Sequence, residues 1–321
     1  MQKPSKHKVQ VAVVGCGYWG KNLIRNFYEL GALYGICDAD TNVVSHFANE
    51  YSVNNLSFNE VLLSTEIDAV IVATPANTHA SIANEILESG KHVFIEKPIA
   101  LNVDDAKAII KKAREMNKHI MVGHILNYHP AFIQLSKMIE EGSVGEILNI
   151  TSSRLSWGKV RKEEDVIWSF APHDISMILS LIKSKPIKTK VQKTCILNNL
   201  IADTANMQII FENKTTASIN LSWLSPIKEN KLTITGKSGI LIFDDTQTWD
   251  KKLSFCSIKY DIPNSLTPEK SNFEYIPIIE SEPLKRECNH FLDLVANGDE
   301  VENITSGEEG LRVLEILNDS N

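Results

Sequence analysis

The chain has 321 residues, 43% of them hydrophobic, and this length favours two domains, each with its own core. Its 33 basic and 40 acidic residues leave a net charge of −7, which argues against a nucleic-acid-binding protein. No apolar run follows the basic N-terminus, none approaches the roughly 18 residues of a membrane helix, and the five cysteines are scattered, so we expect a soluble, cytoplasmic protein without a membrane partner.

Short apolar runs alternate with helical patterns in the first part of the chain. The predicted strands are 9–14, 32–37, 68–73, 92–95 and 119–122, and the predicted helices are 20–30, 42–51, 77–89 and 102–116. Strands separated by helices at this spacing predict right-handed βαβ units and a parallel sheet covered on both faces. We therefore expect an α/β domain over residues 1–123.

The pattern changes after residue 123. A helix at 131–141 is followed by strands at 146–153, 189–197, 206–211, 216–223, 231–235, 239–244 and 253–257, with one helix near 172–181, a loop at 258–283, and helices at 284–296 and 307–317. Polar and apolar residues alternate in several of these strands, which is typical of an antiparallel sheet with one face in water. Residues 124–321 are therefore predicted to form an α+β domain on a largely antiparallel, open sheet.

A glycine-rich turn follows the first predicted strand. Gly15, Gly17 and Gly20 fit the pattern GxGxxG, and Tyr18 and Trp19 complete the turn. In such a turn the first glycine permits a tight bend, the second lets the backbone approach a pyrophosphate, and the third lets the helix pack on the strand. The helix that follows presents free N–H groups to the anion. This context predicts a dinucleotide site.

The second predicted strand ends at Asp38, which lies 18 residues after Gly20. A carboxylate at about this distance binds the adenosine ribose hydroxyls in dinucleotide-binding folds. Its negative charge would repel a 2′-phosphate, so the sequence favours NAD over NADP as the cofactor. The alternative is that Asp38 is only a turn residue or a helix cap.

A lysine follows the strand predicted at 92–95, in the segment Ile95-Glu96-Lys97-Pro98. Ligands of parallel sheets bind beyond the carboxyl ends of the strands. A lysine at that edge can be partly withdrawn from water, which suits it to exchange a proton or to polarise an oxygen. On the pattern alone, an ordinary surface lysine is the more common explanation.

These elements together resemble the glucose–fructose oxidoreductase and inositol dehydrogenase family, Gfo/Idh/MocA. The resemblance rests on the glycine turn, Asp38, Ala73-Thr74-Pro75 with His79, and the segment from Gly90 to Pro98. It implies a Rossmann domain followed by a sheet domain, with Lys97 between the nicotinamide and the substrate. It further implies cofactor contacts from these residues: Gly15, Gly17, Tyr18, Trp19, Gly20, Asp38, Thr74, Pro75, His79, Glu96 and Lys97. Since the open sheet often forms an oligomer interface in this family, we expect a homodimer or homotetramer.

The family's second catalytic mark is Asp-x-x-x-His on a helix of the second domain. His173 matches the histidine, but Ser169 stands where many members have aspartate. The resemblance therefore implies a catalytic pair of Lys97 and His173, with the neighbouring Asp174 unassigned. Histidine suits general acid–base work on a sugar hydroxyl near neutral pH. Without the resemblance, a hydrogen-bonded histidine in a cleft wall is the simpler interpretation of His173.

Residues for substrate binding are expected near the domain junction and after the first strand of the second domain. Asn127 and Tyr128 are candidates for the cleft lining. Arg154 and Arg161, with Lys159 and Trp157 between them, could clamp a diphosphate and stack on a base, although a solvated loop is equally consistent with the sequence. Neither spacing nor nearby cysteines support a metal site at His124 and His129, so no metal is predicted.

Several segments resemble the bacterial sugar-nucleotide branch of the family. They are 127–130, 158–161, 168–174 and 222–229. This branch includes the UDP-N-acetylglucosamine 3-dehydrogenases, whose 3-keto product usually passes to a PLP aminotransferase in lipid A or surface-glycan synthesis. Serine at the position of Ser169 is not unusual there. The identity of the sugar is expected to depend on the loops around Tyr128, Arg161 and Trp223.

The predicted activity is NAD-dependent oxidation of the C3 hydroxyl of a UDP-N-acetylhexosamine, with UDP-N-acetylglucosamine favoured. Oxidation of a UDP-N-acetylglucosaminuronate at the same carbon is the nearest alternative, and reduction of a keto-deoxysugar nucleotide is the third. A non-catalytic NAD-binding sensor is the alternative from another class of protein. The presence of both Lys97 and His173 argues against a sensor, which needs neither residue.

Overall fold

The computed structural model describes residues 7–158, 160–161, 164–259 and 267–319. The chain divides into two compact units. Unit 1 comprises Met1–Ile125 and Glu282–Glu315, and unit 2 comprises Leu126–Ser281 and Ile316–Asn321. No helix among the described residues is both long enough and apolar enough to cross a bilayer.

Unit 1 is built on a parallel sheet. In the described part of the chain this sheet has six strands in the order β3-β2-β1-β4-β5-β6. Their bounds are β1 Val11–Val14, β2 Leu33–Cys37, β3 Asn54–Asn55, β4 Ala69–Val72, β5 His92–Glu96 and β6 Ile120–Gly123. The order reverses between β1 and β4, and ligands of such sheets bind at this switch point, beyond the carboxyl ends. The predicted parallel α/β architecture is confirmed.

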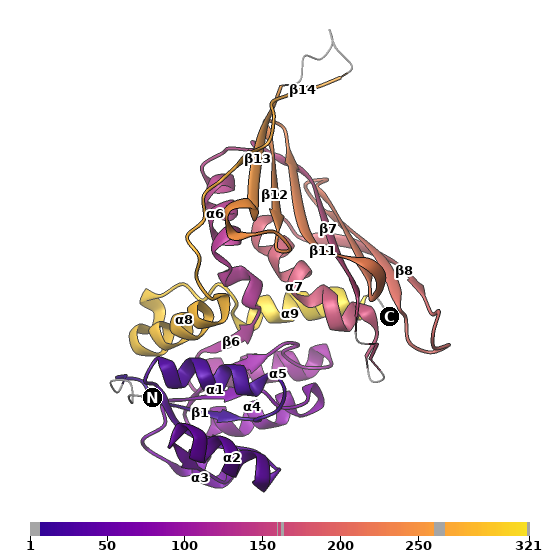
Figure 1. Cartoon of the computed structure of the whole chain (residues 1–321). Helices are drawn as coiled ribbons and strands as arrows, with labels where there is room; N and C mark the ends of the chain where they lie inside the picture. The colour runs from indigo at the N-terminus through magenta and orange to yellow at the C-terminus, as the bar shows by residue number, and fades with distance from the viewer. Residues whose placement is uncertain (1–6, 159, 162–163, 260–266, 320–321) are drawn as a thin grey trace. The chain divides into compact units, whose positions relative to one another are not determined.

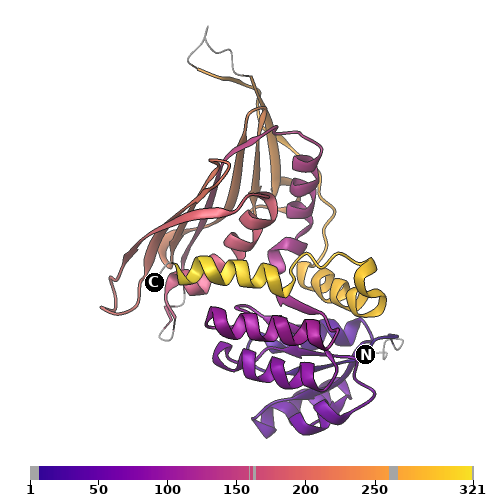
Figure 2. The same cartoon turned by 180° about the vertical axis from the view of Figure 1, so that it is seen from behind.

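Helices cover both faces of this sheet, with α1 facing the viewer in Figure 1 and α4 and α5 facing the viewer in Figure 2. Their bounds are α1 Gly20–Glu29, α2 Thr41–Tyr51, α3 Phe58–Leu63, α4 His79–Glu88 and α5 Val103–Glu115, with the short 3-10 helix η1 at Ala76–Thr78. Side chains cap several of them, including Asp40 on α2 and Asn102 on α5. The sequence prediction missed α3, which is a short helix held by a capping box between Ser57 and Glu60.

The C-terminal helices α8 (Pro283–Asn297) and α9 (Gly307–Asn318) lie mostly in unit 1. The division predicted at residue 123 assigned both to the second domain, and the structure corrects this. The ring of Phe291 on α8 contacts Phe94 on β5, with 5.6 Å between centroids. The backbone N–H of Val122 in β6 donates to the carbonyl of Thr305 over 2.7 Å, so the segment before α9 docks on the sheet's edge strand.

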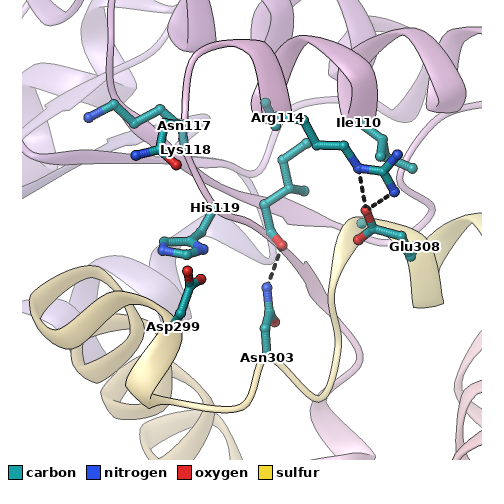
Figure 3. Close-up of a pocket in the computed structure, with 11 residues that line it drawn as sticks. Ile110, Arg114, Asn117, Lys118, His119, Asp299, Asn303 and Glu308 are labelled. Atoms are coloured by element: carbon teal, nitrogen blue, oxygen red, sulfur yellow. Dashed lines mark hydrogen bonds and ion pairs between the residues drawn. The ribbon is translucent and has the colours of Figure 1, made fainter.

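A cavity of about 220 Å³ lies where this segment meets the start of β6 (Figure 3). Asn303 donates to the carbonyl of Ile120 over 2.8 Å, and Arg114 on α5 pairs with Glu308 over 2.7 Å. The cavity adjoins the amino ends of the strands, whereas the glycine turn follows the carboxyl end of β1. It is therefore part of the C-terminal docking surface and not of the dinucleotide site.

Unit 2 is built on a second, mostly antiparallel sheet. Within the residues described, it has nine strands, and β10 and β7 form its parallel pair. The bounds are β7 Ile147–Trp157, β8 Pro186–Thr194, β9 Thr204–Phe211, β10 Thr216–Ser222, β11 Leu224–Gly236, β12 Gly239–Asp244, β13 Leu253–Lys259, β14 Glu269–Lys270 and β15 Glu274–Tyr275. The predicted sheet class is confirmed. The loop predicted at 258–283 contains the short strands β14 and β15, and its residues 260–266 lie outside the described part.

One face of this sheet carries α6 (Pro130–Glu140) and α7 (Val166–Leu181), as Figures 1 and 2 show. The short 3-10 helices of the chain's second half are η2 Ile125–Tyr128, η3 Trp249–Lys251 and η4 Gly298–Glu300. Along β9, Met207 and Ile209 are buried whereas Asn206 and Gln208 are exposed. The alternation read from the sequence therefore corresponds to one packed and one open face.

Loss of the Phe291 ring should destabilise unit 1. Phe291→Ala removes a fully buried ring that packs on β5, and we expect the free energy of unfolding to fall by about 3–5 kcal/mol. Chemical denaturation followed by circular dichroism measures this. Phe273→Ala, at a side chain that is 41% exposed, is the matched control and should change stability by less than about 0.5 kcal/mol. Equal effects would contradict the docking of α8 on the sheet.

Candidate active site

Close backbone packing shapes the glycine turn between β1 and α1. Gly15 has φ +101°, and a Cβ there would lie 2.6 Å from the backbone of Ala73 after β4. A Cβ on Gly20 would lie 1.9 Å from the carbonyl oxygen of Gly15. By contrast, a Cβ on Gly17 would meet nothing within 4 Å, so open space lies over the middle of the turn. The turn therefore offers the exposed backbone that a pyrophosphate requires.

The N-terminus of α1 faces the same turn. No side chain caps it, and its first turn contains no acidic residue. The first N–H groups of a helix have no partner within the helix and carry partial positive charge, so they attract an anion. The N–H groups of Lys21 and Asn22 donate to the carbonyls of Gly17 and Trp19. The partial positive charge of a helix start without a side-chain cap, next to an open glycine turn, still fits the pyrophosphate of a dinucleotide.

Asp38 follows β2 and is tied to the glycine turn. One carboxylate oxygen accepts from the backbone N–H of Cys16 over 2.6 Å, and the other accepts from the N–H of Asp40 over 2.9 Å. The cap of α2 is Asp40, which accepts from Asn42, so Asp38 is not that cap. Burial, with the charge of Asp38, raises the pKa of the Cys16 thiol to about 12. The carboxylate thus stands beside the turn, where the ribose hydroxyls were predicted to bind.

The residues after β4 are linked to those after β5 through His79. Its Nε2 lies 2.9 Å from the carbonyl oxygen of Thr74, and its Nδ1 lies 2.8 Å from that of Pro98. Only 1% of His79 is exposed, and burial lowers its pKa. The predicted cofactor residue His79 therefore holds Thr74 and the residue after Lys97 in place, while Pro75 is exposed. The bond between Lys97 and Pro98 is cis.

Glu96 joins the end of β5 to the glycine turn. Its Oε1 accepts from the indole N–H of Trp19 over 2.5 Å. Its carboxyl group lies over Gly123 at the end of β6, where a Cβ would come within 2.9 Å of it. Burial raises the pKa of Glu96 to about 7, against the opposing effects of Trp19 and Lys97. Tyr18, by contrast, is 85% exposed.

The charge of Lys97 acts to lower the pKa values of two histidines and one glutamate in unit 1. Burial, followed by that charge, lowers the pKa of His124 to about 3, and the same two causes act in the same direction on His79. The His124 imidazole is therefore uncharged at neutral pH. Glu96 provides the opposite charge beside Lys97.

In unit 2, the residues predicted to line the cleft are buried. Asn127 is 5% exposed and donates to the hydroxyl of Ser176 over 2.7 Å, and Tyr128 is 3% exposed. His129 caps α6, stacks on Trp249 with 5.2 Å between centroids, and lies 3.4 Å from Asp245. Within the described residues, no group of three or more His, Cys, Asp or Glu side chains is placed to hold a metal ion.

Helix α7 carries His173 and Ser169. Residues four apart lie on one face of a helix, so the two side chains share a face. Ser169 is buried and His173 is half-buried. Asp165 caps the helix by accepting from two backbone N–H groups, at Ile167 and Trp168. Pro172, directly before His173, has no N–H to donate within the helix.

Asp174, which sequence reasoning left unassigned, binds Arg154 in a bidentate ion pair. The two N–H···O distances are 2.7 and 3.0 Å, and Ser152 donates to the same carboxylate over 2.7 Å. The Arg154 side chain is 15% exposed and that of Asp174 is 2% exposed. Burial alone would lower the pKa of Arg154, but Asp174 raises it. Arg154 on β7 therefore orients the buried carboxylate of Asp174 on α7. No motif of the sequence contains both residues.

The other basic groups predicted after β7 differ in their exposure. Arg161 is exposed and pairs with Glu164 over 3.2 Å, and Lys159 lies outside the described residues. Trp157 is 76% exposed. Trp223, which was expected in a loop that reads the sugar, is only 1% exposed and donates to Asp203 over 2.6 Å. The Trp223 ring is therefore part of the core, and the role of the loop around it stays a prediction.

Two family models match the chain. Residues 9–124 match the oxidoreductase family with an NAD-binding Rossmann fold, and residues 132–242 match the GFO/IDH/MocA C-terminal domain. The first match confirms the predicted cofactor, NAD. The open space over Gly17, the uncapped α1 and Asp38 agree with it.

Among curated relatives, the chain is 34% identical over 163 residues to 2,7-anhydro-N-acetylneuraminate hydratase of Escherichia coli (strain K12), which covers 50% of this chain but only 43% of the relative. It is 27% identical over 215 residues to UDP-N-acetylglucosamine 3-dehydrogenase of Acidithiobacillus ferrooxidans, which covers 67% of each chain. A solved structure of the latter enzyme superposes with a TM-score of 0.84 at 25% identity, over 96% of this chain and 95% of that one.

Replacing Asp38 should weaken coenzyme binding. Asp38→Ala removes the carboxylate beside the glycine turn, and we expect the Kd for NAD to rise about tenfold to a hundredfold, measured by calorimetric titration. Asp40→Ala is the control, because it removes only the cap of α2 and costs about 1 kcal/mol of stability. Unchanged NAD affinity in Asp38→Ala would refute the ribose assignment.

Breaking the buried ion pair of unit 2 should destabilise that unit. Arg154→Ala leaves the Asp174 charge without its partner, so we expect a loss of about 3–5 kcal/mol in chemical denaturation. Arg161→Ala removes an exposed pair and should cost less than about 1 kcal/mol. If Arg154→Ala were as stable as Arg161→Ala, the ion pair would not organise the unit.

Proposed function

Because the chain belongs to the Gfo/Idh/MocA oxidoreductase family, we propose that it oxidises the C3 hydroxyl of a UDP-N-acetylhexosamine, with UDP-N-acetylglucosamine favoured, to the 3-keto sugar nucleotide. One observation carries this proposal. The similarity to UDP-N-acetylglucosamine 3-dehydrogenase extends along almost the whole of both chains, with a TM-score of 0.84. The site described above holds the residue types that this chemistry needs.

Bound NAD would supply the acceptor for the hydride from C3. In our proposal, His173 acts as the general base and takes the proton of the C3 hydroxyl, so the oxygen becomes a carbonyl and the imidazole becomes an imidazolium. Lys97 donates a hydrogen bond to the same oxygen, which favours its loss of the proton. Glu96 and Asp38 serve the coenzyme side of the site.

The proposed substrate contacts come from unit 2. Arg161, an exposed guanidinium, would bind the diphosphate, since arginine matches phosphate oxygens with two parallel hydrogen bonds. Asn127 and Tyr128 would line the sugar site. The Arg154 guanidinium is bound to the carboxylate of Asp174, the neighbour of His173. Arg154 would therefore act on the substrate site through Asp174.

We further propose that the chain assembles as a homodimer or homotetramer through the open face of its second sheet, where polar side chains such as Asn206 and Gln208 are exposed. A 3-keto sugar is a substrate for transamination, so a PLP aminotransferase would act next, in lipid A or surface-glycan synthesis. These steps would take place in the cytoplasm.

A second candidate is a reaction on an N-acetylated sugar with no net redox change. The identity of 34% to 2,7-anhydro-N-acetylneuraminate hydratase over half of this chain favours it. Such a reaction would convert substrate without any accumulation of reduced nicotinamide. The two candidates are therefore separated by one absorbance measurement combined with product analysis.

The test offers the protein NAD with UDP-N-acetylglucosamine, its uronate, thymidine-linked sugars and N-acetylated free sugars. A 2-oxo acid is added in parallel to recycle tightly held coenzyme. We expect nicotinamide absorbance to rise with UDP-N-acetylglucosamine. If the absorbance rose with the uronate alone, the uronate would replace UDP-N-acetylglucosamine as the proposed substrate. Product formed without a rise in absorbance would favour the second candidate. If no compound were converted, the remaining candidate would be an NAD-binding sensor.

Lys97→Met and His173→Ala should each reduce turnover by about a hundredfold or more while NAD still binds. Lys111→Met and His46→Ala are matched controls, because their side chains are 80% and 72% exposed on helices α5 and α2. Steady-state kinetics and NAD titration measure both quantities. Near-normal turnover in either site variant would remove that residue from the mechanism.

A further inference from the structure

Helix α8 carries a carboxyl group in an apolar core. Glu287 has no exposed surface, and neither of its carboxylate oxygens has a hydrogen-bond partner among the residues that the structure describes. A charged carboxylate in such surroundings is strongly unfavourable, whereas a neutral acid is much less so. Native proteins rarely bury a polar group in this way without a role for it.

The position of Glu287 follows from the packing of α8 on β5. Phe291 lies one helical turn after Glu287, and its ring contacts that of Phe94. On β5, Glu96 lies two residues after Phe94 and therefore on the same face of the sheet. Glu287 precedes Phe291 by one helical turn, about 5.4 Å, and Glu96 follows Phe94 by about 6.6 Å, so both carboxyl groups lie one step from the ring contact, near enough for the charge of Glu96 to act on Glu287. Burial, and then the charge of Glu96, raises the pKa of Glu287 well above its ordinary value.

Glu96 stands between this buried acid and the coenzyme site. It accepts the hydrogen bond of Trp19, in the glycine turn, over 2.5 Å, and it directly precedes Lys97. Its own pKa is raised to about 7 by burial, with Trp19 and Lys97 acting in the opposite direction. A negative charge on Glu96 strengthens the bond from the indole, since charge-assisted hydrogen bonds are about twice as strong as neutral ones.

Other titratable groups lie near the pair or on the same helix. Cys288, next to Glu287, is also fully buried, and burial raises the pKa of its thiol. Arg25 on α1 and Glu282 before α8 form an ion pair with each other. Lys97 is the cation that acts on Glu96. Within the described residues, Glu96 is the charged group that acts on Glu287, after burial.

From this geometry we propose that Glu287 is a positioning residue: it stays a neutral acid behind Glu96, keeps water from that carboxyl, and confines the pair's single negative charge to Glu96, where the charge holds Trp19 and the coenzyme turn. The inference deepens the proposed function and rests on it for the role of Lys97. Under this proposal, the strength of the hydrogen bond between Trp19 and Glu96 depends on pH, because Glu96 loses its charge below about pH 7.

The first test asks whether Glu287 is neutral. Its pKa is higher in the folded than in the unfolded chain, so its contribution to stability is fully present below the unfolded value and is lost as the pH rises. Glu287→Gln cannot ionise. Its Tm relative to wild type should therefore rise steadily between about pH 5 and pH 8.

Glu282→Gln is the matched control on the same helix. The Arg25 bond lowers the pKa of Glu282, so that variant should lose stability by an amount that stays constant above about pH 5. If Glu287→Gln behaved like Glu282→Gln, with a Tm difference independent of pH, Glu287 would be ionised in the wild type and the proposal would be overturned.

The second test asks whether Glu287 acts through Glu96. In the wild type and in Glu287→Gln, we expect the affinity for NAD to fall as the pH is lowered, with a midpoint near pH 7. In Glu96→Gln, the affinity should not change with pH in this range. Glu287→Ala opens a polar space that water can enter, so the midpoint should move to lower pH.

A merely structural role would give a different result. Glu287→Ala would then weaken NAD binding equally at every pH, with its midpoint unchanged, and the proposal would fail. Both tests measure folding and NAD binding without any sugar. A failure of the proposed sugar oxidation is therefore distinguishable from a failure of this inference.

Discussion

The site depends on a close approach of three backbone segments at the switch point of the parallel sheet. Gly20 packs on the carbonyl of Gly15, and Gly15 packs on the chain after β4, at distances that leave no room for a Cβ. This contact fixes where α1 begins and leaves the middle of the turn open at Gly17. Two carboxylates of the coenzyme site are bound to this turn, Asp38 through Cys16 and Glu96 through Trp19.

Carboxyl groups surround this turn in three different states. Asp38 accepts two backbone hydrogen bonds, from Cys16 and Asp40. Glu96 is partly withdrawn from water, so its pKa lies near neutrality. Glu287 is fully buried, and its carboxyl oxygens have no hydrogen-bond partner in the part of the chain that the structure describes. The differences come from burial and hydrogen bonding and not from the chemistry of the side chains, and they place a single adjustable charge beside Lys97.

Much of the fold was predictable because its signals are local. The alternation of strands and helices, the glycine turn and the distance to Asp38 all lie within short windows, and the parallel sheet followed from them. The short α3 carries too few residues to show a period. The docking of α8 could not be predicted, because Phe291 and Phe94 are far apart in the sequence and meet only through tertiary packing.

The same distinction applies to the site. Lys97 and His173 belong to short motifs, and sequence reasoning therefore named them. It could not find the partners that join distant segments. For Arg154, the sequence left a diphosphate clamp and a solvated loop open, and it did not indicate the ion pair with Asp174. Glu287 gave no signal beyond one acidic residue on an amphipathic helix. The feature that distinguishes Glu287 is its burial, which exists only in the folded chain.

The proposed reaction transfers a hydride from C3 of the sugar to the nicotinamide. It is tested most directly with UDP-N-acetylglucosamine that carries deuterium at C3. After one turnover, mass spectrometry of the reduced coenzyme should show the deuterium, and the sugar product should have lost it. Deuterium retained in the sugar while reduced coenzyme forms would contradict the claim, because the hydride would then have come from another carbon.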